Sequence, residues 1–290
     1  MASSRTRRLV LVALAAALIT LLAFAPGALG DAISPESGGG SKNAESIDTL
    51  YKIALYVAIL IFLLVEGVLL WSIFRYRARR GGPEPAQIRG NTPLELGWTI
   101  GAALILVVLA TVTFIYLARI EDPPRSDPGG LQSVVNERAE LGQPPVPGGK
   151  SLTVLVNGQQ YIWRFVYPGQ PQLFSYHTMV VPTGTTIVLK ITSSDVNHSW
   201  WVPKLGGKAD AVPGHVNSTW FKIKRGQEGV YGGQCAELCG YNHADMRNSV
   251  RAVSPAQFLA WEKRQRADIK AAQIAVEKQR AQRLRSGGIQ

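Results

Sequence analysis

The sequence has 290 residues, of which 46% are hydrophobic, and its formal net charge is +11. The hydrophobic residues are concentrated in an apolar N-terminus and two long apolar runs, which leaves enough chain for one soluble domain of roughly 100–150 residues. The basic residues lie in the leader, beside the apolar runs and in the last 36 residues. They form no stripe with aromatic side chains of the kind that nucleic-acid-binding folds carry, so we expect no nucleic-acid partner.

Residues 1–30 have the pattern of a secretory signal peptide. Three arginines among residues 5–8 precede an apolar stretch over residues 9–24, and Ala28-Leu29-Gly30 is a small-x-small cleavage site. A third transmembrane helix is the alternative, but the stretch is short for a span and Pro26-Gly27 closes it. We therefore expect cleavage before Asp31 and a mature N-terminus outside the cytoplasm.

Two apolar runs predict a transmembrane hairpin over residues 50–118, after a flexible Gly/Ser-rich lead-in at residues 31–49. Residues 53–74 are interrupted only by Glu66, residues 96–117 carry no charge, and both runs are long enough to span a bilayer. Arginines crowd the loop between them, which marks it as cytoplasmic and places both ends of the hairpin outside. A carboxyl at the depth of Glu66 should face protein, so we expect it to meet a polar group of a neighbouring subunit.

Residues 119–149 are rich in Pro and Gly and predict a linker, with a short helix near residues 134–141. From residue 150 to 254 the chain changes to short β-rich runs separated by turn residues, a pattern typical of a Greek-key β-sandwich or barrel. We expect strands at residues 152–156, 161–167, 178–181, 185–192, 218–223, 230–232 and 249–253.

Residues 255–290 predict a basic helix. Apolar and basic residues alternate there, as in an amphipathic helix that lies on a membrane surface or on a partner subunit. A solvated, partly frayed tail beyond residue 272 is the alternative.

One segment carries most of the chemistry: two cysteines, a histidine and a methionine fall within twelve residues. These are Cys235, Cys239, His243 and Met246, and His198 lies upstream in Asp195-Val-Asn-His-Ser-Trp200. Thiolate, imidazole and thioether form a soft donor set, which selects copper, whereas a closed zinc site prefers four thiolate or imidazole ligands. A disulfide is the default for two exported cysteines, but it leaves the other donors unexplained.

The number of cysteines indicates how many metal ions the site holds. A mononuclear blue-copper site needs one Cys, two His and a weak axial Met. Two thiolates can instead bridge two coppers, with His198 and His243 as terminal ligands and with Met246 and a backbone carbonyl completing the ends. His215 lies in a loop, has no place in this arrangement and is left out of the site.

Residues 195–250 resemble the dinuclear copper (CuA) segment of cytochrome c oxidase subunit II. The resemblance rests on Val196-Asn-His-Ser-Trp200, Lys208-Ala-Asp-Ala-Val-Pro-Gly214 and the run from Tyr231 to Met246, and it extends to Asn91-Thr-Pro-Leu-Glu-Leu-Gly-Trp98. It implies a cupredoxin-like all-β domain behind a two-helix membrane hairpin. The copper ligands it implies are His198, Cys235, the backbone carbonyl of Glu237, Cys239, His243 and Met246.

The same resemblance implies further roles. The Glu237 side chain would face a magnesium or manganese ion shared with subunit I, with Asp210 nearby. Glu95 would lie at the entrance of a proton uptake path, and a snorkelling surface residue is the equal alternative for it. The implied function is that of an aa3-type-like oxidase: copper takes electrons from cytochrome c and passes them to the haem of subunit I, where O2 is reduced and protons are translocated. The implied location is the inner cell membrane, with the copper domain on its extracytoplasmic side.

Two features depart from the family pattern. Gln160-Tyr161-Ile162-Trp163 places Tyr161 where many members have the tryptophan that takes up the electron, and Trp163 is either part of that path or a core residue. Residues 150–253 hold more Lys and Arg than Asp and Glu, so we expect a donor that is acidic or membrane-tethered. The alternatives are a copper-free quinol oxidase subunit, which lacks the cysteine pair, a copper-delivery protein, and a nitrous-oxide reductase domain, which lacks the hairpin.

Overall fold

The computed structural model describes residues 40–77, 84, 86–131, 151–169 and 172–285. The predicted signal peptide and the predicted short helix in the linker lie outside these residues. The described chain divides into two units, residues 46–122 and the remainder.

The first unit holds two helices that are long and apolar enough to cross a membrane, α3 (Lys42–Arg75) and α4 (Thr92–Glu121). Asn91 caps α4, because its side-chain oxygen accepts a hydrogen bond from the Leu94 N–H at 3.3 Å. Glu95 accepts from the Asn91 N–H at 3.0 Å, so the two side chains each satisfy a backbone N–H at the start of the helix. Glu66 is exposed on α3 in this single chain, and its polar partner stays a prediction.

The prediction of a flexible lead-in over residues 31–49 is wrong from residue 42 onward, since α3 begins at Lys42. The reason is contact with residues far along the chain. The Ser41 hydroxyl accepts from the Lys222 N–H at 3.1 Å, and the Asn43 amide donates to the Trp220 carbonyl at 2.9 Å. Both contacts satisfy backbone groups at the edge of a sheet, so these polar residues are buried and ordered although their composition is typical of a linker.

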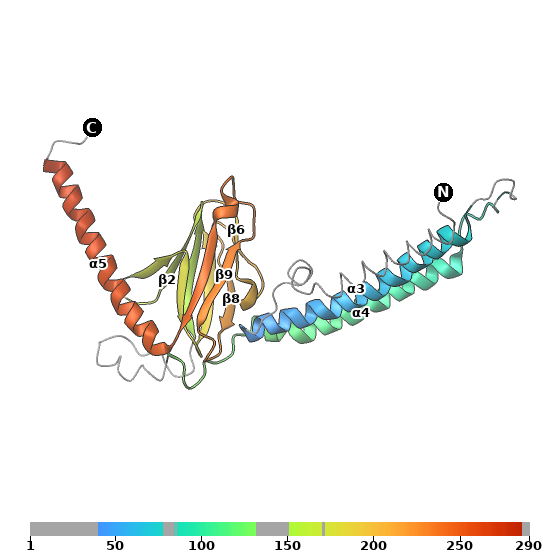
Figure 1. Ribbon diagram of the computed structural model, residues 1–290, viewed down its shortest axis with the longest axis horizontal. Helices are drawn as coiled ribbons and strands as arrows, with labels where there is room; N and C mark the ends of the chain where they lie inside the picture. The colour runs from blue at the N-terminus through green and yellow to red at the C-terminus, as the bar shows by residue number, and fades with distance from the viewer. Residues whose placement is uncertain (1–39, 78–83, 85, 132–150, 170–171, 286–290) are drawn as a thin grey trace, which may run out of the picture. The chain divides into compact units, whose positions relative to one another are not determined.

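The second unit is a sandwich of two five-stranded sheets (Figure 1). The first sheet has the order β3-β2-β1-β5-β8, with β1 (Leu152–Gln159), β2 (Ile162–Tyr167), β3 (Leu173–Tyr176), β5 (Thr186–Ser193) and β8 (Asn217–Lys222). The second has the order β4-β10-β9-β6-β7, with β4 (Thr178–Pro182), β6 (His198–Trp201), β7 (Ala209–Ala211), β9 (Gly229–Cys235) and β10 (Arg247–Val253). The predicted two-sheet sandwich is therefore confirmed, and β3, β6 and β7 are strands that the sequence pattern did not predict.

The core lies between the sheets and follows from the alternation of side chains along the strands. In β1 every second residue is buried, so Leu152, Val154 and Val156 face the opposite sheet. Trp163 and Phe165 from β2 are fully buried beside them. A further core residue of β2, Tyr167, also joins the sheets through its hydroxyl, which bonds to both backbone groups of Val180 in β4.

Helix α5 (Pro255–Arg285) packs against β3 and β4, which are edge strands of the two sheets. Ser254 and Gln257 form a capping box at its start, with N–H to side-chain oxygen distances of 3.1 and 3.3 Å. Phe258 and Trp261 are buried, and the rings of Trp261 and Tyr167 meet edge-on with their centroids 5.1 Å apart. Beyond residue 270 every described residue of the helix is exposed, and its surface for a membrane or a partner stays a prediction.

Candidate metal centre

The five predicted side-chain ligands come from two neighbouring strands and the loop that follows one of them. His198 is the first residue of β6, and Cys235 is the last residue of β9. Cys239 lies in the loop after β9, His243 begins a short 3-10 turn (His243–Asp245), and Met246 follows directly. The pairing of Trp200 with Cys235 brings the two strands together so that His198 and the cysteines meet.

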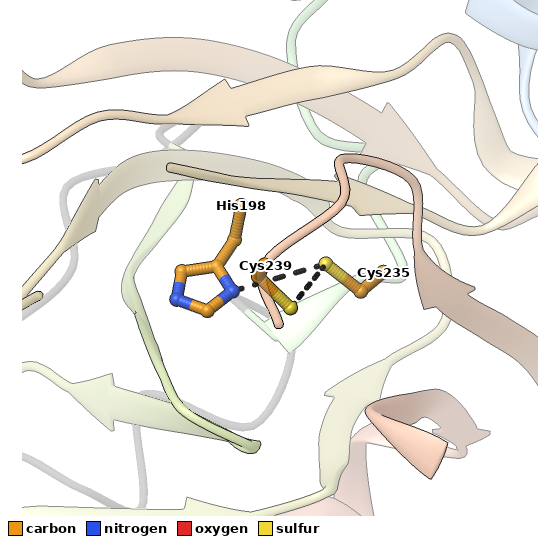
Figure 2. A group of neighbouring side chains, drawn as sticks. All are labelled: His198, Cys235 and Cys239. Carbon is orange, nitrogen blue, oxygen red and sulfur yellow. Dashed lines mark hydrogen bonds between the residues drawn. The ribbon is translucent and has the colours of Figure 1, made fainter. Parts of the chain in front are cut away.

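The two cysteine thiols and His198 form a buried cluster (Figure 2). The Cys235 sulfur lies 3.9 Å from His198 Nδ1 and 4.0 Å from the Cys239 sulfur. Both cysteines are free, and their sulfurs are about twice as far apart as the roughly 2.05 Å of a disulfide bond. The structure thus favours the metal-site interpretation over the disulfide.

The remaining donors gather at the same two sulfurs. The Cys239 sulfur lies 3.6 Å from His243 Nδ1 and 3.7 Å from the Met246 sulfur. The Cys235 thiol donates to the Glu237 carbonyl at 3.3 Å. Each thiol therefore has one imidazole and one weak donor beside it, and whether the site holds two ions stays a prediction.

A carboxylate holds the His198 ring at the nitrogen that faces away from the cysteines. Asp195 Oδ1 lies 2.9 Å from His198 Nε2, which leaves Nδ1 to face Cys235. Burial opposes ionisation of Asp195, but hydrogen bonds from the Gln160 N–H, from His198 and from the Val196 N–H outweigh it and lower its pKa to about 2. A metal-binding histidine commonly donates its second N–H to a carboxylate, so this contact fits a ligand role.

Burial and the neighbouring Cys235 thiol raise the pKa of Cys239 to about 11. A buried thiol of this kind stays protonated unless a cation compensates the thiolate charge, and metal binding supplies that charge. A typical metal–thiolate bond is about 2.3 Å, so one ion can contact both sulfurs when they are 4.0 Å apart. The donor set is soft, and the residues present therefore fit copper.

Two aromatic candidates lie close to the centre. The Trp163 ring is fully buried and its centroid lies 5.9 Å from that of the His198 ring, which agrees with the core interpretation and also places it beside a predicted ligand. Tyr161 is half-buried in the β1–β2 turn, and its ring meets the 89% exposed Tyr241 edge-on at 5.4 Å. The two tyrosine rings thus lie at the loop that holds Cys239, and their role in electron uptake stays a prediction.

The other candidates lie outside this cluster. The Glu237 side chain is exposed, and so is Asp210, which pairs with Ser199 across β6 and β7. Glu95 lies in the first turn of α4, where it bonds to the helix cap, and His215 is exposed in a loop. Sequence reasoning missed Gln160 and Asp195 as supporting residues, although the three-residue step from Asp195 to His198 was a signal for the second.

Two family models match the chain. The periplasmic domain of cytochrome c oxidase subunit II matches residues 168–253, and the transmembrane domain of the same subunit matches residues 37–115. A probable cytochrome c oxidase subunit 2 of Rickettsia bellii is 32% identical over 237 residues, which cover 75% of this chain and 78% of the relative. The cytochrome c oxidase subunit 2 of Cereibacter sphaeroides is 32% identical over 248 residues, 78% of this chain and 80% of the relative.

Among solved structures, the chain is similar to the periplasmic domain of subunit II of cytochrome oxidase of Bradyrhizobium japonicum. The sequences are 32% identical, the match covers 41% of this chain and 96% of that one, and the TM-score is 0.39.

These matches span both the membrane hairpin and the β-sandwich, and the sandwich carries the buried cysteine and histidine cluster that a copper domain needs. The predicted cupredoxin-like fold class is confirmed, and the protein is a membrane protein whose metal centre lies in a periplasmic domain. The chain therefore belongs to the cytochrome c oxidase subunit II family and is a subunit of a haem-copper terminal oxidase.

Proposed function

We propose that the periplasmic domain binds two copper ions between Cys235 and Cys239, and that this chain is the subunit through which an aa3-type-like oxidase takes up electrons. When bound, the dinuclear copper supplies one-electron transfer from an external donor to the haem of subunit I, where O2 is reduced and protons are translocated. The observation that carries the proposal is the pair of free thiols 4.0 Å apart, each with an imidazole beside it.

The chain's own residues hold the site in one geometry. Cys235 and Cys239 would hold the copper through their thiolates, together with one imidazole nitrogen from each of His198 and His243. Met246 and the Glu237 carbonyl supply the weak donors. Because the cysteines, His198 and Met246 are buried, water is largely excluded from the site. Such a site suits electron transfer better than substrate chemistry.

The donor would approach the copper loop, defined as residues 235–246, where Tyr161 and Tyr241 form an aromatic pair. We assign electron uptake to Tyr161, with Trp163 behind it against the His198 ring. Residues 151–253 hold nine Lys and Arg against five Asp and Glu, so an acidic or membrane-tethered cytochrome c suits the surface better than a basic one. Turnover that is faster with a basic than with an acidic donor at low salt would contradict this part.

Two further assignments rest on the resemblance and on position. Glu237 presents an exposed carboxylate, to which we assign a magnesium or manganese ion shared with subunit I, with Asp210 nearby. Glu95 is assigned to proton uptake at the cytoplasmic end of α4 in the inner cell membrane. Its hydrogen bond to the helix cap favours a structural role as well. Glu95→Gln should slow proton uptake without loss of helix, and unchanged proton uptake would leave only the structural role.

The test is electron paramagnetic resonance of the full-length, copper-loaded chain in detergent, with Cys235→Ser as the comparison. A hyperfine pattern from one electron shared by two equivalent coppers, absent in Cys235→Ser, would support the proposal. His215→Ala is the matched control, because His215 is exposed and outside the cluster, and it should leave the pattern unchanged. A single-copper pattern in the unsubstituted chain would refute a dinuclear site.

A further inference from the structure

The copper loop is closed at its base by a bond between its own two ends, and next to Cys235 it is tied to β6. The Cys235 N–H donates to the Met246 carbonyl and the Ala236 N–H donates to the Ser199 carbonyl, both at 2.9 Å. Between these ends the loop bonds mainly to itself, for example from the His243 N–H to the Gly240 carbonyl at 3.1 Å. The middle of the loop therefore depends on few contacts with the rest of the protein.

Among the hydrogen bonds of the described residues, one joins loop residues 237–245 to a residue outside the copper loop. The side-chain amide of Gln160 donates to the Cys239 carbonyl at 2.7 Å. Gln160 lies in the turn between β1 and β2, on the sheet opposite the one that carries the loop. This bond fixes the backbone of a thiol ligand against the first sheet.

The backbone of the same residue reaches the other end of the centre. The Gln160 N–H donates to Asp195 Oδ2 at 2.7 Å, and Asp195 Oδ1 holds His198 Nε2 at 2.9 Å. Gln160 thus contacts Cys239 directly and His198 through one carboxylate. Two ligands that face different ends of the site are therefore connected to a single turn.

Two glycines beside this turn have no room for a Cβ atom. A Cβ atom on Gly240, whose φ is +130°, would lie 2.5 Å from the Tyr161 hydroxyl and 3.1 Å from the Gln160 amide nitrogen. A Cβ atom on Gly158 would lie 2.9 Å from the His198 ring. The β1–β2 hairpin therefore packs closely against both the loop and the histidine, and Gln160 bonds to the loop directly and to His198 through Asp195.

We propose that Gln160 is a positioning residue of the copper centre, which holds Cys239 and His198 in their ligand geometry before and after metal binding. This inference rests on the proposed copper function. A loop that is ordered in advance gives up less conformational freedom when it binds metal and releases the metal more slowly. Loss of the Gln160 bond should loosen residues 237–245 without unfolding the sandwich.

The experiment compares Gln160→Glu with Gln159→Glu in the full-length chain in detergent. Glutamate keeps the length of the side chain but turns a donor into an acceptor that faces the Cys239 carbonyl. Gln159 is exposed and lies one residue earlier, at the end of β1, so it controls for the added charge. Two readouts are used: amide hydrogen exchange of residues 237–245 without metal, and the rate of copper release to a chelator.

For Gln160→Glu we expect exchange and copper release that are both roughly ten-fold faster, with an unchanged thermal midpoint. Gln159→Glu should match the unsubstituted chain in all three. Exchange and release that do not differ between the two variants would overturn the proposal. If the chain binds no dinuclear copper, the proposed function fails, whereas the exchange of the metal-free loop still decides whether Gln160 holds it.

Discussion

Tyr167→Phe tests whether one hydroxyl joins the two sheets. The Tyr167 hydroxyl accepts from the Val180 N–H at 2.8 Å and donates to the Val180 carbonyl at 2.9 Å. Val180 lies in β4, an edge strand of the second sheet, so the hydroxyl takes the place that a further strand would fill. Phenylalanine keeps the ring against Trp261 and removes only the oxygen.

The substitution leaves two buried backbone groups without a hydrogen bond. Each such group costs about 1–3 kcal/mol, so we expect the free energy of unfolding to fall by about 2–4 kcal/mol. Urea unfolding followed by tryptophan fluorescence of the full-length chain measures it. Tyr176→Phe is the control, because that ring is 47% exposed on the adjacent β3 and should change the free energy by less than about 0.5 kcal/mol. Equal effects of the two substitutions would refute the reasoning.

The same residue predicts a pH dependence. Burial raises the pKa of Tyr167 above its ordinary value of 10.0, so the folded state keeps the proton while the unfolded chain releases it. Stability is therefore fully present below pH 10 and falls as the pH rises, with a slope of about 1.4 kcal/mol per pH unit. Tyr167→Phe should remove this slope. A slope that persists in the variant would show that another group controls alkaline unfolding.

Three other changes have defined outcomes. Gly240→Ala forces a Cβ against the Tyr161 hydroxyl at a positive φ, so copper binding should weaken roughly ten-fold by chelator competition; unchanged binding would contradict the close packing. Phe258→Ala should cost about 3–5 kcal/mol of unfolding free energy, whereas deletion of residues 273–290 should cost less than about 0.5 kcal/mol; a large loss on deletion would mean that the exposed half of α5 supports the sandwich. Asp195→Asn removes a negative charge next to a ligand, so the reduction potential of bound copper should rise in a potentiometric titration; a lower potential would argue against the charge effect.

Several elements followed directly from sequence patterns. The apolar runs predicted two membrane helices because length and hydropathy suffice to recognise them. The strand at residues 152–156 was predicted because one of its faces is buried, so its side chains alternate. By contrast, β6 carries three buried residues in a row, His198, Ser199 and Trp200, and therefore shows no alternation that would mark it as a strand.

The start of α3 was missed for a related reason. The residues at its start are polar, and they are held in place by hydrogen bonds to Trp220 and Lys222, about 180 positions later in the chain. Local composition cannot report a contact at that separation. Gln160 was missed in the same way, since its partner Cys239 lies 79 residues further on.

The sequence by itself determined the chemistry of the centre. The residue types Cys, His and Met and their spacing between Cys235 and Met246 specify a soft donor set, because ligand preference depends on the atoms that the side chains carry. The tertiary structure decided which donors meet and what holds them. His198 reaches Cys235 across 37 residues because β6 pairs with β9. Gln160 reaches the site from the opposite sheet, and Asp195 reaches it from the connection between β5 and β6. Strand pairing fixes these distances, and it depends on the packing of the whole sandwich.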